Sequence, residues 1–217
     1  MKKKAIVLVS GGMDSLYLCE IARSKCDELY FLHINYGQRT EKKELECFYK
    51  ICEFFKPIES KVVDIKFIAE FGGNSLTDST LSIPKNREQS DEVPNTYVPF
   101  RNGIFVSIAT AWAEVISATH IYIGAIEVDG SGYPDCREVF YQSIEKTINL
   151  GSTNCSELKI EIPLINLTKI EIVRRGLELD LPFHISWSCY ESNELTCGTC
   201  DSCLLRKAAF LKNGVVE

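Results

Sequence analysis

Residues 4–15 read Lys-Ala-Ile-Val-Leu-Val-Ser-Gly-Gly-Met-Asp-Ser, an apolar run that stops at a pair of glycines. A short aliphatic run bounded by a turn signal is typical of a buried β-strand. The residues after the glycines, from about 14 to 24, predict a helix. The stretch therefore indicates a strand that passes through a tight glycine turn into a helix.

The turn at residues 10–15 has the composition of an anion-binding loop. Its two glycines let the backbone approach an anion without a Cβ in the way. The free N–H groups and the dipole at the start of a helix favour negative charge. Ser10 and Ser15 add hydroxyl donors, and Asp14 is a candidate to hold Mg²⁺ or to position a donor. We therefore predict a phosphate site here.

The turn lacks the Gly-Lys-Ser/Thr of a Walker A loop and the glycine spacing of a dinucleotide fingerprint. It resembles the PP-loop, Ser-Gly-Gly-x-Asp-Ser, with which ATP-pyrophosphatases grip the departing pyrophosphate. The resemblance implies attack at the α-phosphate, with AMP and pyrophosphate as products. It implies an adenine-nucleotide α-hydrolase-like α/β fold, with a parallel five-stranded sheet in the order 3-2-1-4-5 and ATP above the carboxyl ends of the strands. It assigns ATP binding to Ser10, Gly11, Gly12, Met13, Asp14 and Ser15.

The first two-thirds of the chain alternates short apolar runs with helical patterns, as βαβ units around a parallel sheet do. Thr168 and Glu171 have the spacing of a capping box at a helix start. Strands are expected over residues 4–9, 29–35, 62–65, 121–125 and 159–162. Residues 72–96 predict a long polar loop. We divide the chain into a PP-loop ATP-pyrophosphatase domain, residues 1–180, and a small zinc-binding C-terminal subdomain, residues 181–217.

Composition narrows the classes of function. A chain of 217 residues suits one α/β domain with a small appendage. The net charge of −6 argues against a nucleic-acid partner. The apolar runs are too short to cross a bilayer, so we expect no membrane partner and a cytoplasmic protein. Ten cysteines in such a chain indicate metal binding or burial rather than disulfides.

Four cysteines near the end of the chain have metal-ligand spacing, C-x₇-C-x₂-C-x₂-C. Four thiolates satisfy tetrahedral Zn²⁺ with no open position, so the predicted site is structural. His184 is close enough in sequence to replace one ligand. A redox pair for sulfur transfer and simple packing remain as alternatives. The predicted ligands are Cys189, Cys197, Cys200 and Cys203.

Three further polar segments, residues 36–39, 97–102 and 129–137, follow expected strands or precede an expected helix. They read Tyr-Gly-Gln-Arg, Tyr-Val-Pro-Phe-Arg-Asn and Asp-Gly-Ser-Gly-Tyr-Pro-Asp-Cys-Arg. Ligands of open α/β sheets bind at this edge. We therefore expect these segments to form a substrate site together with the phosphate turn.

These segments, with Trp-Ser-Cys-Tyr at residues 187–190, resemble the 7-cyano-7-deazaguanine synthase family from about residue 4 to 210. The resemblance implies a ligase that forms carbon–nitrogen bonds. It would turn 7-carboxy-7-deazaguanine and ammonia into the nitrile preQ0 for queuosine and deazapurine biosynthesis, through acyl-adenylate and amide intermediates. The implied cofactors are structural Zn²⁺ and ATP with Mg²⁺. A homodimer is implied as well.

By position, Arg101 and Arg137 are assigned to a substrate carboxylate or phosphate, because a guanidinium pairs bidentately with oxyanions. Asp135 is expected to accept from the guanine-like N–H groups, Tyr133 to stack on the base, and Lys169 to bind phosphate. The full predicted set of substrate or catalytic residues is Gln38, Arg39, Arg101, Asn102, Glu127, Asp129, Tyr133, Asp135, Arg137 and Lys169.

Glu127 and Asp129 are candidates to hold Mg²⁺ or to deprotonate ammonium. Thr40, Phe100 and Gly130 depart from the family pattern at the substrate rim, which concerns fine specificity rather than adenylation. Two alternative functions stay open. One is a paralogue that passes the same adenylate to another amine, for example on a protein. The other is a tRNA-acting PP-loop enzyme, against which the acidic charge counts.

Overall fold

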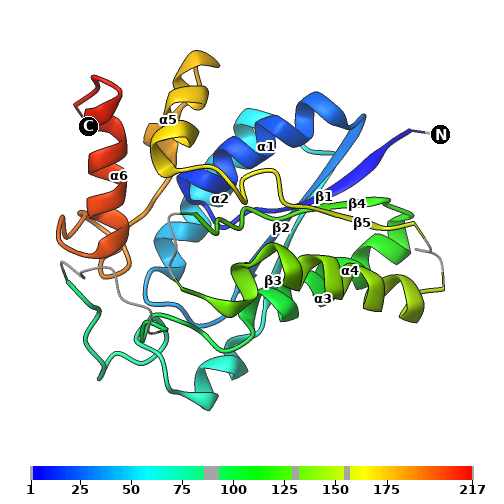
Figure 1. Cartoon of the computed structure of the whole chain (residues 1–217), viewed down its shortest axis with the longest axis horizontal. Helices are drawn as coiled ribbons and strands as arrows, with labels where there is room; N and C mark the ends of the chain where they lie inside the picture. Colours follow the sequence, from blue (N-terminus) through cyan, green and yellow to red (C-terminus); the bar gives the residue numbers. More distant parts are fainter. Residues whose placement is uncertain (1, 86–92, 129–131, 154–156, 217) are drawn as a thin grey trace.

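The computed structural model describes residues 2–85, 93–128, 132–153 and 157–216. Its centre is a parallel sheet of five strands in the order β3-β2-β1-β4-β5 (Figure 1). The predicted α/β class and strand order are confirmed. The strands are β1 (Lys4–Leu8), β2 (Glu28–Asn35), β3 (Glu59–Asp64), β4 (His120–Tyr122) and β5 (Lys159–Glu161).

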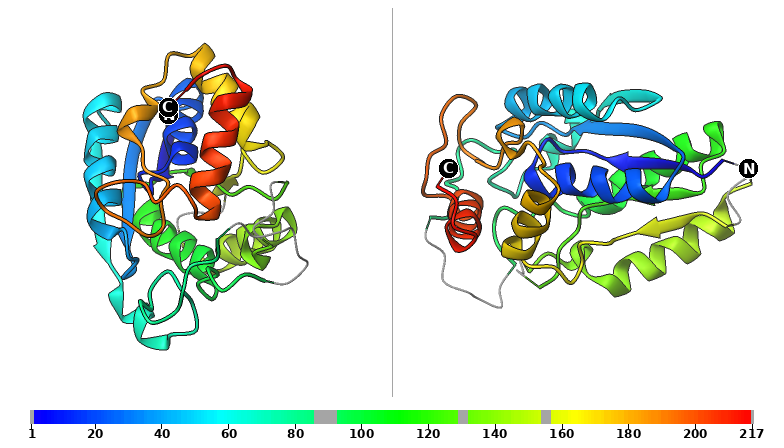
Figure 2. Two further views of the ribbon diagram at one scale, coloured as in Figure 1. Left: turned by 90° about the vertical axis from the view of Figure 1, so that its left-hand side faces the viewer. Right: turned by 90° about the horizontal axis from the view of Figure 1, so that it is seen from above.

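Helices cover both faces of the sheet (Figures 1 and 2). One face carries α1 (Met13–Lys25), α2 (Glu41–Phe55) and α5 (Lys169–Glu178), and the other carries α3 (Arg101–Ile116) and α4 (Glu138–Gly151). The last helix, α6 (Asp201–Lys212), packs on α5. Three short 3-10 helices complete the described elements: η1 (Lys66–Phe71), η2 (Pro134–Cys136) and η3 (Phe183–Ile185).

The central strand, β1, is buried on both faces of the sheet. The side chains of Val7 and Val9 pack in the apolar cluster between the sheet and helices α1 and α2. Those of Ile6 and Leu8 pack in the cluster between the opposite face of the sheet and α3. Because successive side chains of a strand point to opposite faces, a strand that is buried on both faces reads as a continuous apolar run. This explains the unbroken run that opens the chain.

The outer strands differ from the sequence expectation. β3 begins at Glu59, three residues before the expected start, and most of its side chains are exposed. As an edge strand it pairs with β2 alone among the described strands, so its apolar signal is confined to the part around Val63, which packs against the core. β4 stops at Tyr122, and the residues after it lie on a cavity wall instead of in the sheet.

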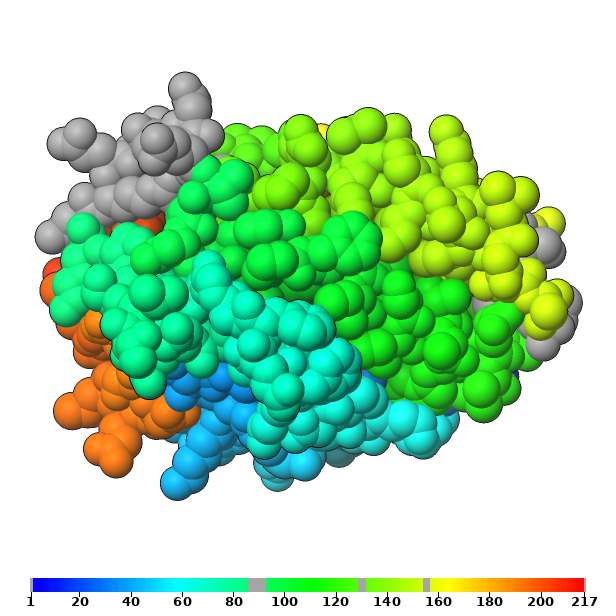
Figure 3. Space-filling view, turned by 90° about the horizontal axis from the view of Figure 1, so that it is seen from below, coloured from blue at the N-terminus to red at the C-terminus, as the bar shows by residue number. Residues whose placement is uncertain are grey.

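The C-terminal segment shares its core with the sheet domain. Phe183 and Phe210 meet edge to face with ring centroids 5.3 Å apart, inside the cluster that also holds α1. Thr168 and Glu171 form the predicted capping box at α5. Seen from below, residues of the 72–85 loop extend to the C-terminal segment (Figure 3). Within the described ranges, every helix falls short of the length and apolarity that a membrane span requires.

Candidate active site

A cavity of about 960 Å³ lies at the carboxyl edge of the sheet. Its walls come from residues 8–10 and 12–15, the ends of β2 and β4, the start of α3, residues 187–190 and the first turns of α6. This is the edge at which ligands of open α/β sheets bind. The predicted phosphate turn, part of the predicted substrate set and the cysteine-rich segment therefore surround one cavity.

The phosphate loop, defined as residues 10–15, has the geometry of an anion site. Gly11 has a φ of +89°, and a Cβ there would lie 2.5 Å from the backbone oxygen of Glu44. The Ser15 hydroxyl donates to the Gly12 carbonyl at 2.9 Å and holds the turn closed. Within the described ranges no side chain caps α1, so N–H groups of its first turn remain available to an anion.

Lys169 meets the phosphate loop although 155 residues separate it from Asp14 in the chain. Its ammonium contacts Asp14 Oδ2, and both residues line the cavity. The other carboxylate oxygen, Asp14 Oδ1, is buried and has no hydrogen-bond partner in the described part of the chain. The pair therefore places a cation beside the loop and leaves one carboxylate oxygen for a ligand.

Arg101 faces the same cavity from the first turn of α3 and is held in place by aromatic rings. Its guanidinium donates to Tyr36 Oη at 3.0 Å, and its central carbon lies 5.2 Å from the Tyr36 ring centroid and 5.8 Å from that of Phe105. Burial raises the pKa of Tyr36 to about 12, so the phenol stays neutral and accepts this bond. Arg101 is therefore fixed before any substrate arrives.

Asp135 lies behind the cavity wall rather than on it. Its carboxylate accepts from the backbone N–H of Asn102 at 2.9 Å, and the Asn102 side chain donates to Cys136 Sγ at 3.2 Å. Burial raises the pKa of Asp135 and raises that of Cys136 to about 11. Asp135 thus anchors η2 to the start of α3, while Asn102 and Cys136 line the cavity and the thiol stays protonated.

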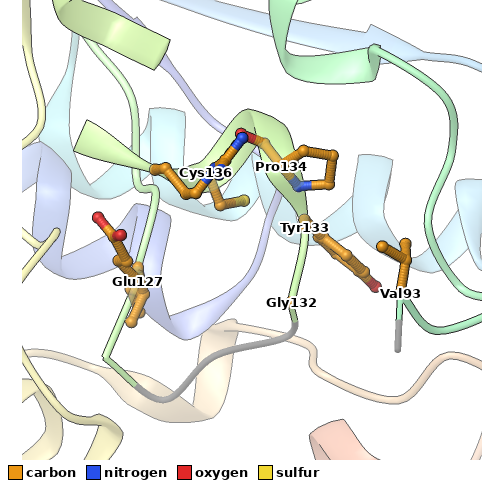
Figure 4. A pocket seen from close by; sticks show the side chains of 8 residues that line it. Val93, Glu127, Gly132, Tyr133, Pro134 and Cys136 are labelled. Carbon is orange, nitrogen blue, oxygen red and sulfur yellow. The ribbon is translucent and has the colours of Figure 1, made fainter. Parts of the chain in front are cut away.

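A second pocket of about 310 Å³ adjoins the first, because Tyr133 and Cys136 line both (Figure 4). Glu127 and Tyr133 flank it from opposite sides (Figure 4). The Tyr133 hydroxyl donates to Thr96 Oγ1 at 2.7 Å. Tyr133, the residue predicted to stack on the base, therefore lies between the cavity and the second pocket.

Two charged residues of the predicted set belong to this second pocket. Glu127 Oε2 accepts from the backbone N–H of Glu138 at 2.9 Å and so satisfies the first turn of α4. Arg137 donates from Nε to the Pro134 carbonyl at 3.2 Å and is exposed. The third predicted residue of this region, Asp129, lies outside the described residues.

Gln38 and Arg39 make contacts within the protein, and neither lines the two pockets. Gln38 accepts from the backbone N–H of Tyr36 and donates to Glu44, each at 3.0 Å. The Arg39 guanidinium donates to the carbonyls of Asp78 and Leu81. Arg39 therefore holds the 72–85 loop.

The cavity is also lined by residues outside the predicted set, among them Tyr36, Trp187, Glu44 and Phe105. Tyr36 and Trp187 stand inside the motifs quoted above, whereas Glu44 and Phe105 lie on the helices α2 and α3, outside any motif. Phe105 follows Arg101 by four residues, and this spacing, which places two side chains on one helix face, is the one signal that points to it.

The predicted metal ligands converge. One sulfur from each of Cys189, Cys197, Cys200 and Cys203 lies within 4.8 Å of the others, and the cysteine cluster is defined as these four residues. The Cys197 and Cys203 sulfurs are 3.9 Å apart. Tetrahedral zinc with Zn–S bonds of about 2.3 Å requires sulfurs about 3.8 Å apart, so the donor set fits a metal ion. His184 is not a member of the group.

The cluster thiols differ in how readily they ionise, because burial raises the pKa of Cys200 and of Cys203. Burial acts against ionisation of Cys197, but hydrogen bonds from Thr199 and Cys200 outweigh it and lower the pKa of this thiol to about 7. Ile83 packs among the cluster sulfurs, and Lys85 pairs with Cys200 in an antiparallel bridge. The cluster thus holds the far end of the 72–85 loop.

Comparisons with known proteins agree with this geometry. The family described as "Queuosine biosynthesis protein QueC" matches residues 4–214. The chain belongs to this family. Proteins named 7-cyano-7-deazaguanine synthase resemble it over nearly their whole length. That of Chlorobaculum tepidum is 50% identical over 212 residues, which cover 98% of this chain and 93% of the relative. That of Campylobacter jejuni serotype O:2 is 47% identical over 215 residues, which cover 99% of this chain and 96% of the relative.

Among solved structures, NMN synthetase from Francisella tularensis aligns with a TM-score of 0.51 at 15% identity. The alignment covers 100% of this QueC family chain and 79% of that chain. At this identity the likeness concerns the fold alone.

Proposed function

We propose that this chain converts 7-carboxy-7-deazaguanine and ammonia to 7-cyano-7-deazaguanine, with cleavage of ATP to AMP and pyrophosphate. Membership of the QueC family and the names of its relatives support the proposal. The observation that carries the chemistry is the cavity. The uncapped phosphate loop opens into the same space of about 960 Å³ as Arg101 and Lys169, so a nucleotide and an acid fit side by side.

In the first half-reaction the substrate carboxylate attacks the α-phosphorus of ATP, and pyrophosphate leaves with the electrons of the broken P–O bond. The phosphate loop and Lys169 would stabilise the charge that develops on the pyrophosphate. Arg101 would hold the carboxylate, because its fork is already oriented by Tyr36. Ammonia then attacks the acyl carbon, and AMP leaves with one former carboxylate oxygen.

In the second half-reaction the amide oxygen attacks a second ATP in the same way. Loss of AMP and of the remaining amide protons leaves the carbon–nitrogen triple bond. The chemistry requires no protein nucleophile, which agrees with a Cys136 thiol that burial keeps protonated. Catalysis then consists of positioning and charge stabilisation.

Mg²⁺ and Zn²⁺ would bind at two different sites. Asp14 Oδ1 would hold the Mg²⁺ that accompanies ATP, since this buried oxygen has no partner among the described residues. Such an ion neutralises phosphate charge. The cysteine cluster would hold Zn²⁺ in a closed, structural site. The homodimer stays a prediction, as do the substrate or catalytic roles of Gln38, Arg39, Asn102, Glu127, Asp129, Tyr133, Asp135 and Arg137.

The proposal is tested by incubating the protein with ATP, Mg²⁺, ammonium and the carboxy-deazaguanine. We expect two AMP and two pyrophosphate for each nitrile, measured by chromatography and mass spectrometry. ADP as the nucleotide product would contradict the PP-loop assignment. Mass added to a second polypeptide when ammonium is withheld would favour the paralogue that modifies another amine.

Lys169→Met is expected to lower kcat/KM for ATP by about 100-fold, because one preorganised charge at the departing phosphates is lost. Lys207→Met, an exposed lysine on α6, is the matched control and should leave kcat/KM unchanged. Initial rates at varied ATP separate the two. A Lys169→Met protein with full activity would remove this residue from the site.

Tyr36→Phe keeps the ring but removes the hydroxyl that orients Arg101. Loss of about 1 kcal/mol of hydrogen bonding corresponds to an increase of roughly 5-fold in the KM for the acid. The KM for ATP should stay within roughly 2-fold of the value for the unmodified protein, because the Tyr36 hydroxyl bonds to Arg101 and not to the phosphate loop. The exposed Tyr49→Phe is the control. Equal increases in both KM values would contradict the assignment of Arg101 to the acid.

A further inference from the structure

Arg206 is a buried arginine on α6 that does not line the cavity. Its guanidinium donates to Ser186 Oγ at 2.9 Å, to Ser188 Oγ at 3.3 Å and to the carbonyl of Phe183 at 3.0 Å. A planar fork that donates to several groups of one short segment fixes the shape of that segment. The segment in question, residues 183–188, is called the backing turn below.

The backing turn touches the phosphate loop directly. The backbone N–H of Trp187 donates to the Gly11 carbonyl at 2.9 Å. The Trp187 carbonyl oxygen lies 3.5 Å from the place that a Cβ on Gly12 would occupy. Since the two glycines set the path of the loop, a displaced backing turn would displace the N–H groups offered to an anion.

The same helix begins in the cysteine cluster. Cys200 is the residue before the first turn of α6, Cys203 lies inside that turn, and Arg206 follows three residues later. A fixed start of α6 therefore fixes the position of the guanidinium. This gives a continuous set of contacts from the cluster through Arg206 and the backing turn to the phosphate loop.

We propose that Arg206 is a positioning residue for ATP: it holds the backing turn, and the backing turn holds the phosphate loop in its binding conformation. The inference rests on the proposed function, in which the loop binds the phosphates of ATP. It goes further by giving an arginine outside the cavity control over nucleotide affinity.

The first test is Arg206→Met, which keeps apolar bulk and removes the donors. Titration calorimetry with MgATP should show binding weakened by about 3- to 30-fold, the range for residues that act through others. The KM for ATP should rise equally, while the KM for the acid should change by less than about 2-fold. The control is Lys207→Met on the exposed side of α6, which should bind MgATP as the original protein does.

Two conservative variants keep the proposal falsifiable when Arg206→Met does not fold. Arg206→Lys retains the charge but has one donor group, and it should recover part of the affinity. Ser186→Ala leaves the arginine in place, removes one acceptor outside the cavity, and should weaken MgATP binding in the same direction.

Unchanged MgATP affinity in a folded Arg206→Met protein, or in Ser186→Ala when Arg206→Met is unfolded, overturns the proposal. A parallel loss of zinc and of MgATP binding overturns it as well, because the arginine would then serve the cluster. The unmodified protein separates this result from failure of the proposed function, since it must itself bind MgATP and form the nitrile.

Discussion

Gly11→Ala is expected to abolish measurable nitrile formation, with kcat/KM reduced by at least about 100-fold. The added methyl would lie 2.5 Å from the backbone oxygen of Glu44, and that oxygen belongs to α2, so it cannot move aside alone. The backbone at Gly11 also has a φ of +89°, which L-residues with a Cβ rarely adopt. The loop must therefore shift, and its N–H groups shift with it.

Gly214→Ala is the matched control for this variant. Gly214 has a φ of +76°, but a Cβ there would meet nothing within 4 Å. The Gly214→Ala variant therefore has the backbone strain of a positive φ but no steric clash of the added Cβ. It should lose some thermal stability while keeping MgATP binding. Calorimetry with MgATP on both proteins checks the pair. Intact MgATP binding by a folded Gly11→Ala protein would show that the phosphates bind elsewhere.

Cys203→Ser is expected to reduce bound zinc well below one atom per chain and to lower the Tm. Three thiolates remain, but the closed tetrahedral shell is lost. Even about 3 kcal/mol of lost metal binding would lower the Tm by roughly 6–12 °C in a chain of this size. Metal analysis and thermal melts measure the two effects. The half-buried Cys52→Ser on α2 is the control and should keep its zinc.

Loss of the metal should also release the 72–85 loop. Ile83 packs against three cluster cysteines and Lys85 pairs with Cys200, whereas Arg39 holds Asp78 and Leu81. We expect faster proteolysis within residues 82–85 after chelation, mapped by mass spectrometry. An unaltered cleavage pattern in a protein shown to be free of zinc would contradict a structural role for the metal.

Much of this architecture can be predicted from short stretches of sequence. A strand buried on both faces reads as an apolar run, a phosphate turn needs glycine where a Cβ would collide, and four metal ligands need regular spacing. Each of these signals spans few residues. For this reason the glycine turn, the capping box at Thr168 and the four-cysteine group could be predicted from the chain alone.

The uses of single polar residues could not be predicted in the same way. Arg39 stands in a motif beside the expected site, yet its Nη2 group donates to carbonyls about 40 residues later, at Asp78 and Leu81. Asp135 binds the first turn of a helix that precedes it in the chain. Such pairings depend on how distant segments meet, and neither composition nor periodicity records that.

The most direct test uses carboxy-deazaguanine with ¹⁸O in both carboxylate positions, under conditions that form the nitrile with unlabelled ATP. If the acid and then the amide are activated at the α-phosphate, each AMP released must carry one ¹⁸O atom, and pyrophosphate must carry none. Mass spectrometry of the nucleotide gives the answer. Unlabelled AMP, or ¹⁸O in inorganic phosphate, would contradict adenylation of the acid and the amide.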